Sequence, residues 1–378
     1  MTHRTTRTAV ALLCATAVAV LPFSPARADQ VRNNQWHLRY LKVAEAHRIS
    51  QGAGVTVAVI DSGVDPHPDL RNNLLPGNDT YPGGKGDGRT DTDGHGTGMA
   101  GLIAAHGRGS NGVLGIAPRA KIIPIRYFQG KDGDPDNAAT GIEWAMEKGA
   151  TIISVSAVST GTPRLSEAVA RARRSNVVIV AAAGNRPVDY FIGPPAICDG
   201  VVAVGATDTT GKLADVSVTG PQLAIAAPGV DISSTSFDGK YRTGTGTSPS
   251  TAIVAGAAAL VRSKYPDLSA EEVVHRLTAT AVDKGKPGRD EEYGYGVLDL
   301  VAALTADVPP LEGSPAPSNS EPAGAEPTGA GPAAPDPDNA SSNSTTLVIA
   351  LTALVVLGLL VTLLVLQARR RRHHPPAP

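Results

Sequence analysis

Between residues 54 and 207, continuous apolar runs alternate with segments of helical periodicity. The apolar runs are GVTVAVI (54–60), KIIPIRYF (121–128), TIISVSAV (151–158), VVIVAAAG (177–184) and VVAVGAT (201–207). The helical segments are 96–106, 137–149 and 164–176. Runs that are apolar at nearly every position are typical of strands covered on both faces, and strands that alternate with helices form βαβ units. The pattern predicts an α/β fold with three layers, in which a mostly parallel sheet lies between two layers of helices.

The first 28 residues have the layout of a secretory signal peptide. Arg4 and Arg7 precede the apolar run AVALLCATAVAVLPF, and the small residues of ARA at 26–28 provide a cleavage motif. Leu13 stands before Cys14, where a lipoprotein signal requires a small residue, so lipid attachment is disfavoured. We expect residues 1–28 to be removed on export.

A second apolar segment, LVIALTALVVLGLLVTLLVL at residues 347–366, contains 20 residues and no charge. At ~1.5 Å per residue, a helix of this length crosses the ~30 Å hydrocarbon core of a bilayer. Four arginines follow at 369–372, and the positive-inside rule then places the tail, residues 367–378, in the cytoplasm. We therefore expect a single-pass protein of the cell membrane, with everything before residue 347 outside the cytoplasm. The absence of an LPxTG motif before the segment disfavours anchoring to the cell wall by a sortase.

Residues 308–346 consist of Pro, Ala, Gly, Ser and acidic residues, with hardly a large apolar side chain. Such a composition cannot bury enough surface to offset the entropy lost on folding, so we expect a disordered tether. The remaining residues, 51–307, are enough for one large α/β domain, preceded by a short extension at 29–50.

The composition of this domain excludes some classes of function and leaves its stability to packing. The net charge of the whole chain is −1, which gives no reason to expect a nucleic-acid partner. Cys198 is the only cysteine of the domain, so no disulfide can form within it. We expect Cys198 to be a buried, unreactive side chain.

Polar side chains stand where predicted strands end and helices begin. Asp61 follows one run, Ser156 follows TIISV within another, Asn185 follows a third, and His95 and Ser248 each open a helical pattern. In parallel sheets, active sites form at the carboxyl ends of the strands. A serine hydroxyl becomes a nucleophile when a histidine takes its proton and a carboxylate orients that histidine. The order Asp, His, Ser is one of the known arrangements of such a triad.

Four local motifs carry these residues: VAVIDSGVDPHPDL, DGHGTGMAG, VVIVAAAGN and GTSPSTAIVAG. Together they resemble the subtilisin-like serine proteases over most of residues 50–303. The resemblance implies that Asp61, His95 and Ser248 form the triad and that Asn185 donates to the oxyanion, with a weaker contact from Thr247. Residues 250–253, after Ser248 and Pro249, read Ser-Thr-Ala-Ile and lack the helix proline that relatives usually carry there. We interpret Ser250 and Thr251 as first-turn helix residues.

The same resemblance implies that a substrate peptide pairs as a strand between two segments. These segments correspond to 131–134, including Gly133 and Asp134, and to Ser156, Ala157 and Val158. Val158 and Ser159 stand where relatives usually have two glycines, which predicts a narrow pocket and a preference for small P1 residues such as alanine.

At subfamily level, the sequence DQVRNNQWHLRYLKVAEAHRISQGAGVTVAVIDSGVD, the tether and the single C-terminal span resemble the mycosins. Those are membrane-anchored subtilases of type VII secretion systems, so the resemblance implies a secretion membrane complex as partner. The extension 29–50 is too short for an inhibitory prodomain, and we expect it to wrap the domain surface. Mycosins often carry disulfides in this domain, for which the chain lacks the cysteines.

We expect neither a cofactor nor a metal, although calcium stays an alternative for the acidic loop 79–93. His95 and His106 fall on one helical pattern but eleven residues apart, about 16 Å along a helix axis, too far to share an ion. His67 is interpreted as loop packing.

A function of another class also stays open. The chain could be a structural subunit that stabilises a secretion channel, with proteolysis secondary, because a fold does not determine a function.

Overall fold

The computed structural model describes residues 26–130, 132–157 and 159–311. Most of the predicted signal peptide and tether, and the whole apolar segment 347–366, lie outside these residues. Among the helices that are described, none combines the length and apolar character needed to cross a membrane.

A seven-stranded sheet forms the centre of the domain, and every pairing in it is parallel. In spatial order its strands are β11 (Leu223–Pro228), β10 (Val202–Thr207), β9 (Val178–Ala182), β8 (Ile152–Val155), β1 (Thr56–Asp61), β5 (Lys121–Arg126) and β2 (Asn78–Asp79). The five apolar runs singled out in the sequence are all strands of this sheet, which confirms the predicted parallel α/β fold.

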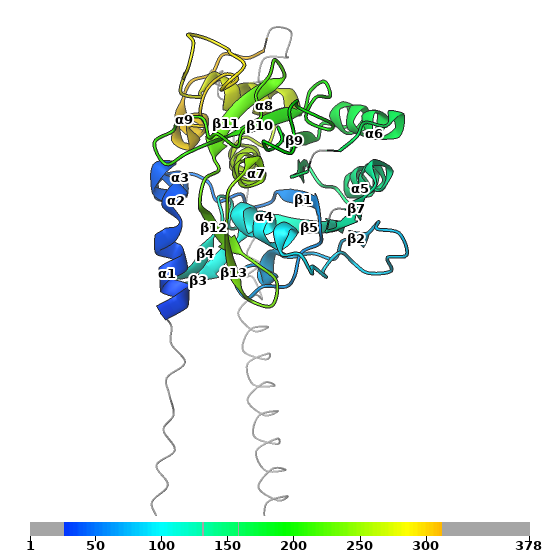
Figure 1. The fold of residues 1–378 in the computed structure, drawn as a ribbon. Helices are drawn as coiled ribbons and strands as arrows, with labels where there is room; N and C mark the ends of the chain where they lie inside the picture. The colour runs from blue at the N-terminus through cyan, green and yellow to red at the C-terminus, as the bar shows by residue number, and fades with distance from the viewer. Residues whose placement is uncertain (1–25, 131, 158, 312–378) are drawn as a thin grey trace, which may run out of the picture. The chain divides into compact units, whose positions relative to one another are not determined.

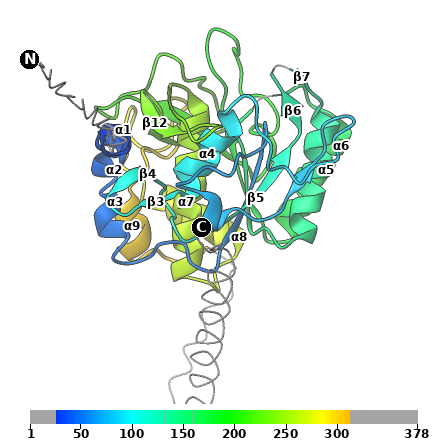
Figure 2. The same ribbon diagram turned by 90° about the horizontal axis from the view of Figure 1, so that it is seen from below.

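Helices cover both faces of the sheet (Figures 1 and 2). One face packs against α4 (His95–Ala104), α7 (Thr247–Lys264) and α8 (Ala270–Ala279), the other against α5 (Pro135–Glu147) and α6 (Pro163–Arg174). In β1, Val57 and Val59 belong to the first core, whereas Ala58 and Ile60 belong to the second. Because both faces are buried, the four central positions of the strand, 57–60, are all apolar.

Local capping chemistry sets the starts of the helices on the outer layers. Asp134 caps α5 and Thr162 caps α6, each followed by a proline, and Ser269 forms a capping box at α8. In contrast, α4 and α7 begin after Gly94 and Gly246, without a side-chain cap. These two uncapped helix starts carry His95 and Ser248.

Several small elements surround this framework. The antiparallel pairs are β3 (His106–Arg108) with β4 (Asn111–Leu114), β6 (Phe128–Gln129) with β7 (Asp132–Gly133), and β12 (Ile232–Thr235) with β13 (Tyr241–Gly244). The remaining helices are α1 (Ala26–Asn34), α2 (Trp36–Tyr40), α3 (Val43–Ala46), the 3-10 turn η1 (Arg71–Asn73) and α9 (Leu300–Thr305).

The segment before the first strand packs closely on the domain. The amide of Gln35 donates to the carbonyl of Leu114 (3.0 Å) and accepts from its N–H (2.9 Å), as a neighbouring strand would. The indole of Trp36 donates to the carbonyl of Val230 at 3.0 Å. His37 is fully buried, and burial lowers its pKa to about 3. Through these contacts the segment is packed against the domain.

Candidate active site

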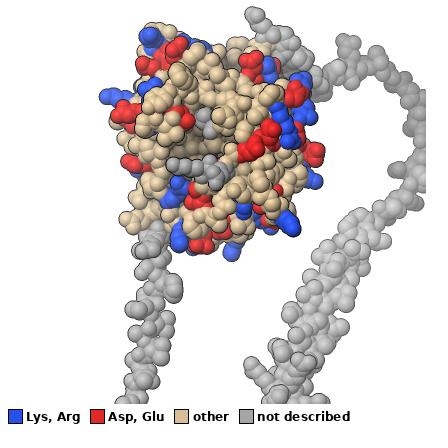
Figure 3. Space-filling model, turned by 45° about the vertical axis from the view of Figure 1, so that its right-hand side comes forward, with Lys and Arg blue, Asp and Glu red and all other residues tan. Residues whose placement is uncertain are grey.

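The order of the strands places a crevice at the carboxyl end of β1. From β1 the chain passes through α4 to β5, which is the neighbour of β1 on one edge. From β8, which is the neighbour of β1 on the other edge, the chain passes through α6 to β9, farther from β1 in the sheet. Strands diverge in this way at the binding crevices of open α/β sheets. Asp61 is the last residue of β1, and Ser156 follows β8 directly. Figure 3 shows a hollow on this side of the molecule, bordered mostly by uncharged residues.

Asp61 and His95 form a hydrogen-bonded pair. Nδ1 of His95 donates to the carboxylate of Asp61, with distances of 2.8 Å to Oδ1 and 3.0 Å to Oδ2. Asp61 is fully buried, while the side chain of His95 keeps 22% of its surface exposed. Burial lowers the pKa of His95, but the charge of Asp61 and the hydrogen bond outweigh it, so that the pKa is raised overall. The pair thus has the geometry of a base held in one tautomer by an acid.

Asp91 holds the loop that leads into His95. One oxygen of its buried carboxylate accepts from the N–H of Gly94 (2.9 Å), the N–H of Asp93 (3.0 Å) and the hydroxyl of Ser62 (2.9 Å). The other accepts from the N–H (2.9 Å) and hydroxyl (2.6 Å) of Thr97. In the sequence, Asp91 belongs to the acidic loop 79–93, for which only calcium binding was kept as an alternative. Its position four residues before His95 is the one signal that points to this role.

Ser62 connects this loop to Asp61. Its N–H donates to Oδ1 of Asp61 at 2.7 Å, and its hydroxyl accepts from the N–H of Gly96 at 2.9 Å while donating to Asp91. Both neighbours of His95, Gly94 and Gly96, are therefore bound to the same network. The glycine at 96 is required for space, because a Cβ there would stand 2.1 Å from the carbonyl oxygen of Gly63.

Ser248 lies in the first turn of α7, where backbone N–H groups have no partner within the helix. Only 8% of its surface is exposed. Its hydroxyl donates to the carbonyl of Ser156 at 3.0 Å, and in the described part of the chain no hydrogen bond joins it to His95. The contact between nucleophile and base that the triad hypothesis requires is therefore not made in this conformation. Catalytic hydrogen bonds often form only in the substrate complex.

The carboxamide of Asn185 has a defined orientation. Its oxygen accepts from the N–H of Thr247 at 2.8 Å and lies 3.3 Å from the Thr247 hydroxyl, which donates to it. Because a backbone N–H cannot bind the NH₂ end, the NH₂ group is left as the available donor. Asp189 holds the backbone of Asn185 by accepting from its N–H at 2.8 Å. Thr247, expected as a weak contact, serves mainly to orient Asn185.

The neighbouring hydroxyls of α7 are engaged in the fold. Ser250 donates to the carbonyls of Ala227 (3.0 Å) and Pro228 (3.1 Å), and Thr251 donates to the carbonyl of Thr247 (2.8 Å). Both residues are fully buried. They are structural helix residues, as the sequence indicated.

The predicted substrate segments border the same crevice only in part. Gly133 lies in β7 and pairs with Phe128, whose ring centre is 6.4 Å from that of His95. The carboxylate of Asp134 caps α5 by accepting from the N–H of Asp136 (2.8 Å), a role that the sequence analysis missed. Ser156 and Ala157 follow β8, whereas the side chain of Val158 lies outside the described residues.

The histidines and acidic residues considered for a metal do not gather in one place. Helix α4 ends at Ala104 and His106 lies in β3, so the predicted shared helix for His95 and His106 was wrong. Asp79 pairs with Arg126 at 3.5 Å, and no group of three or more His, Cys, Asp or Glu is found among the described residues. His67 is fully buried and accepts from the N–H of Asp69 at 3.0 Å, in agreement with loop packing.

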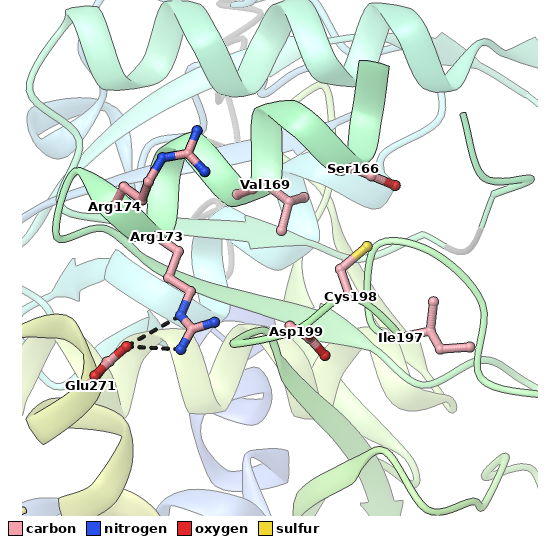
Figure 4. A pocket seen from close by; sticks show the side chains of 9 residues that line it. Ser166, Val169, Arg173, Arg174, Ile197, Cys198, Asp199 and Glu271 are labelled. Carbon is pink, nitrogen blue, oxygen red and sulfur yellow. Dashed lines mark hydrogen bonds and ion pairs between the residues drawn. The ribbon is translucent and has the colours of Figure 1, made fainter. Parts of the chain in front are cut away.

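A second pocket, of about 730 Å³, lies between α6, residues 197–199 and Glu271 of α8 (Figure 4). An ion pair between Arg173 and Glu271, 3.0 Å long, crosses it. Cys198 lines this pocket and is only partly buried, which corrects the prediction of a buried thiol. Burial raises the pKa of Cys198 against the effect of a hydrogen bond with Ser166, so the unreactive thiol form is favoured. The pocket contains none of the predicted catalytic residues.

Comparison with known proteins identifies the domain. A profile of the Subtilase family matches residues 52–296. The chain belongs to the subtilase family. It is a subtilisin-like serine endopeptidase, as the four motifs predicted. A thermostable alkaline protease of Halalkalibacterium halodurans is 38% identical over 273 residues, covering 70% of this chain and 71% of that protein.

Relatives of the mycosin type match more of this subtilase. Mycosin-1 of Mycobacterium tuberculosis is 32% identical over 383 residues, covering 85% of this chain and 83% of that protein. Among solved structures, MycP1 with its N-terminal propeptide removed superimposes with a TM-score of 0.66 at 32% identity, covering 72% of this chain and 98% of that chain. The MycP3 protease from the type VII (ESX-3) secretion system gives a TM-score of 0.61 at 36% identity, covering 72% and 88% of the two chains. The resemblance to mycosins predicted from the sequence is confirmed.

Proposed function

We propose that this subtilase cleaves peptide bonds with Asp61, His95 and Ser248 as its triad and with Asn185 as a donor to the oxyanion. The contact of His95 with the buried carboxylate of Asp61 is the observation that carries the proposal. It leaves Nε2 of His95 as the nitrogen that accepts a proton. The orientation of the Asn185 amide supports the second part.

The reaction follows from these positions. Ser248 rotates away from Ser156, gives its proton to Nε2 of His95 and attacks the scissile carbonyl carbon. Asp61 stabilises the imidazolium, and the NH₂ of Asn185 and the N–H of Ser248 donate to the oxyanion. His95 then protonates the leaving amine, and a water deprotonated by His95 releases the acyl group from Ser248.

The cellular setting belongs to the same proposal. The signal peptide, the apolar segment 347–366 and the arginines after it support a protease held on the outer side of the cell membrane with its C-terminus in the cytoplasm. The relatives named above support a role in a type VII secretion system, in which the chain would process a substrate or support the membrane complex. Protease protection of a C-terminal tag in intact cells tests the orientation.

We also propose that Val158 and Ser159 narrow the P1 pocket, so that small residues such as alanine are preferred. A P1 peptide library tests this preference, and selection of large aromatic residues at P1 would contradict it.

A structural role is the second candidate, and the resting contact of Ser248 with Ser156 favours it, because the nucleophile is not bound to its base. The chain would then stabilise a secretion channel, with proteolysis secondary. Normal secretion by a strain that carries Ser248→Ala would support this candidate.

Labelling with a fluorophosphonate tests the catalytic proposal directly. We expect the full-length protein to be labelled and Ser248→Ala to be unlabelled. Ser250→Ala is the matched control, because Ser250 is two residues away and its hydroxyl binds Ala227 and Pro228. Absence of labelling in folded wild-type protein would contradict the proposal.

A further inference from the structure

Large apolar side chains are exposed mainly in one loop. Six such residues are exposed in the described part of the chain: Val188, Tyr190, Phe191, Ile197, Val282 and Tyr295. Val188 (83% exposed), Tyr190 (69%) and Phe191 (84%) lie within four consecutive positions, and we refer to these three side chains as the 188–191 projection. Soluble proteins seldom expose neighbouring apolar groups in this way unless something binds them.

The loop that carries the 188–191 projection is fixed at its base. Ile192 is 4% exposed and Ala196 is 1% exposed, and both belong to the core between the sheet and helices α5 and α6. The exposed apolar tip therefore belongs to a loop whose base is anchored in the core, and Ile192 of the same stretch points inward as part of that anchor.

Both ends of the loop are joined to the catalytic crevice. At its start, the carboxylate of Asp189 accepts from the N–H of Asn185 at 2.8 Å. At its end, the carbonyl of Pro194 accepts from the N–H of Ser159 at 3.0 Å, next to the predicted substrate segment. Anything that lies along Ser156 and Ala157 toward Asn185 therefore passes beside the base of this loop.

We propose that the 188–191 projection binds a large apolar side chain of the polypeptide substrate, and this inference rests on the function proposed above. Phe191 follows Asn185 by six residues, so at ~3.3–3.6 Å per residue it lies within about 20 Å of the oxyanion donor. An extended substrate covers that length with about six residues, so the recognised side chain lies within about six positions of the scissile bond.

The charges of the loop favour an apolar peptide over a lipid surface. Asp189 is bound to Asn185, and Arg186 donates to the hydroxyl of Thr219 at 3.2 Å. Arg186 is the only Lys or Arg between 185 and 197, whereas segments that lie on anionic membranes combine apolar groups with several basic residues. Continuity with the crevice singles out the substrate over a second copy of the chain.

The test compares a triple variant and a double variant of the full-length protein with the wild type. In the first, Val188→Ser, Tyr190→Ser and Phe191→Ser remove the projection. In the matched control, Val282→Ser and Tyr295→Ser remove exposed apolar groups elsewhere, at 46% and 48% exposure. A peptide library first locates the subsite at which the wild type prefers a large apolar residue. The values of kcat/KM are then measured for two peptides that differ only there, with Phe in one and Ser in the other.

We expect the wild type and the control to prefer the Phe peptide by about tenfold or more, mainly through KM, and the projection variant to lose that preference. Fluorophosphonate labelling should be equal in all three proteins. Missing labelling in the wild type would refute the proposed function itself. Equal labelling with an unchanged preference in the variant, or a wild type without any apolar preference, would overturn this inference. The inference would also be overturned if the projection variant kept the preference but no longer bound phosphatidylglycerol vesicles, which would assign the projection to a lipid surface. The same holds if the variant kept the preference but lost a dimer seen in light scattering, which would assign the projection to a second copy of the chain.

Discussion

The hydroxyl of Ser248 donates to the carbonyl oxygen of Ser156 over 3.0 Å, and the hydroxyl of Ser156 lies 3.4 Å from the carbonyl of Ser248, to which it donates. The start of α7 and the end of β8 are thus joined by a reciprocal pair. In this conformation the hydroxyl of Ser248 is therefore bound to the end of β8 and not to His95.

Replacing Ser248 by alanine should remove nearly all peptidase activity. A triad that loses its nucleophile loses about 10⁶-fold in kcat, so Ser248→Ala should fall to the level of the residual catalysis. Ser250→Ala should keep kcat within about tenfold, because its hydroxyl binds only backbone carbonyls. Steady-state kinetics on a peptide substrate measures both. Equal losses in the two variants would indicate that the start of α7 acts structurally.

The acid limb of the pH profile should reflect the raised pKa of His95. Only neutral His95 accepts a proton, so kcat/KM should fall below a midpoint that lies above 6.5, the ordinary pKa of histidine. Asp61→Asn removes the charge that raises this pKa, so the midpoint should move to lower pH, and kcat should fall by about 10⁴-fold. A midpoint that stays in place would show that Asp61 does not control the titration.

Asp91→Asn should lower kcat by about tenfold to a hundredfold with little change in KM, because it disturbs the loop that positions His95 and not the substrate segments. The amide nitrogen of the variant would face the two donor groups of Thr97, which costs about 1–3 kcal/mol of folding stability. Asp87→Asn is the control from the same acidic loop, since Asp87 is 50% exposed and pairs with Arg89. A change confined to KM would contradict a positioning role.

Asn185→Ala should reduce kcat by about 10²–10³-fold, the usual effect of removing one oxyanion donor. KM should change little, because the donor binds the charge that develops in the transition state. Binding of a peptide boronate, which carries that charge, should weaken in parallel with kcat. An equal loss in substrate binding would instead show that Asn185 already binds the substrate in the ground state.

The framework could be predicted because it depends on local patterns, and the same patterns singled out the candidate residues at the strand ends. Runs such as VVIVAAAG are apolar throughout because β9 is covered on both faces. The ends of the strands could be located because polar residues follow such runs directly. The start of α5 is encoded just as locally, in Asp134 and the proline after it, although Asp134 was assigned only to a substrate segment.

Features that depend on contacts between distant residues could not be predicted. The role of Asp91 requires Ser62 to lie beside it, 29 positions away in the chain. In the sequence, the helical pattern of α4 continues to His106 because no breaker precedes it, yet Ala105 takes an extended conformation and ends the helix. The exposure of Phe191 was equally hidden, since apolar residues are usually buried.

Buried His37 should make the folded domain sensitive to acid. Burial lowers its pKa to about 3, whereas the unfolded chain binds the proton near the ordinary value of 6.5. Below pH 6.5 the unfolded state therefore holds more protons, and the free energy of unfolding decreases as the pH falls toward 3. Between pH 7 and pH 5 this histidine alone should account for a loss of about 2 kcal/mol in the free energy of unfolding.

His37→Leu should remove that part of the pH dependence, as measured by urea unfolding at the two pH values. His275→Leu, at a partly exposed histidine whose ring lies 3.2 Å from the carbonyl oxygen of Pro309, should retain it. If the two variants lose stability in acid to the same extent as the wild type, His37 is already protonated or solvated in the native extension, and the packing of α2 described above would have to be revised.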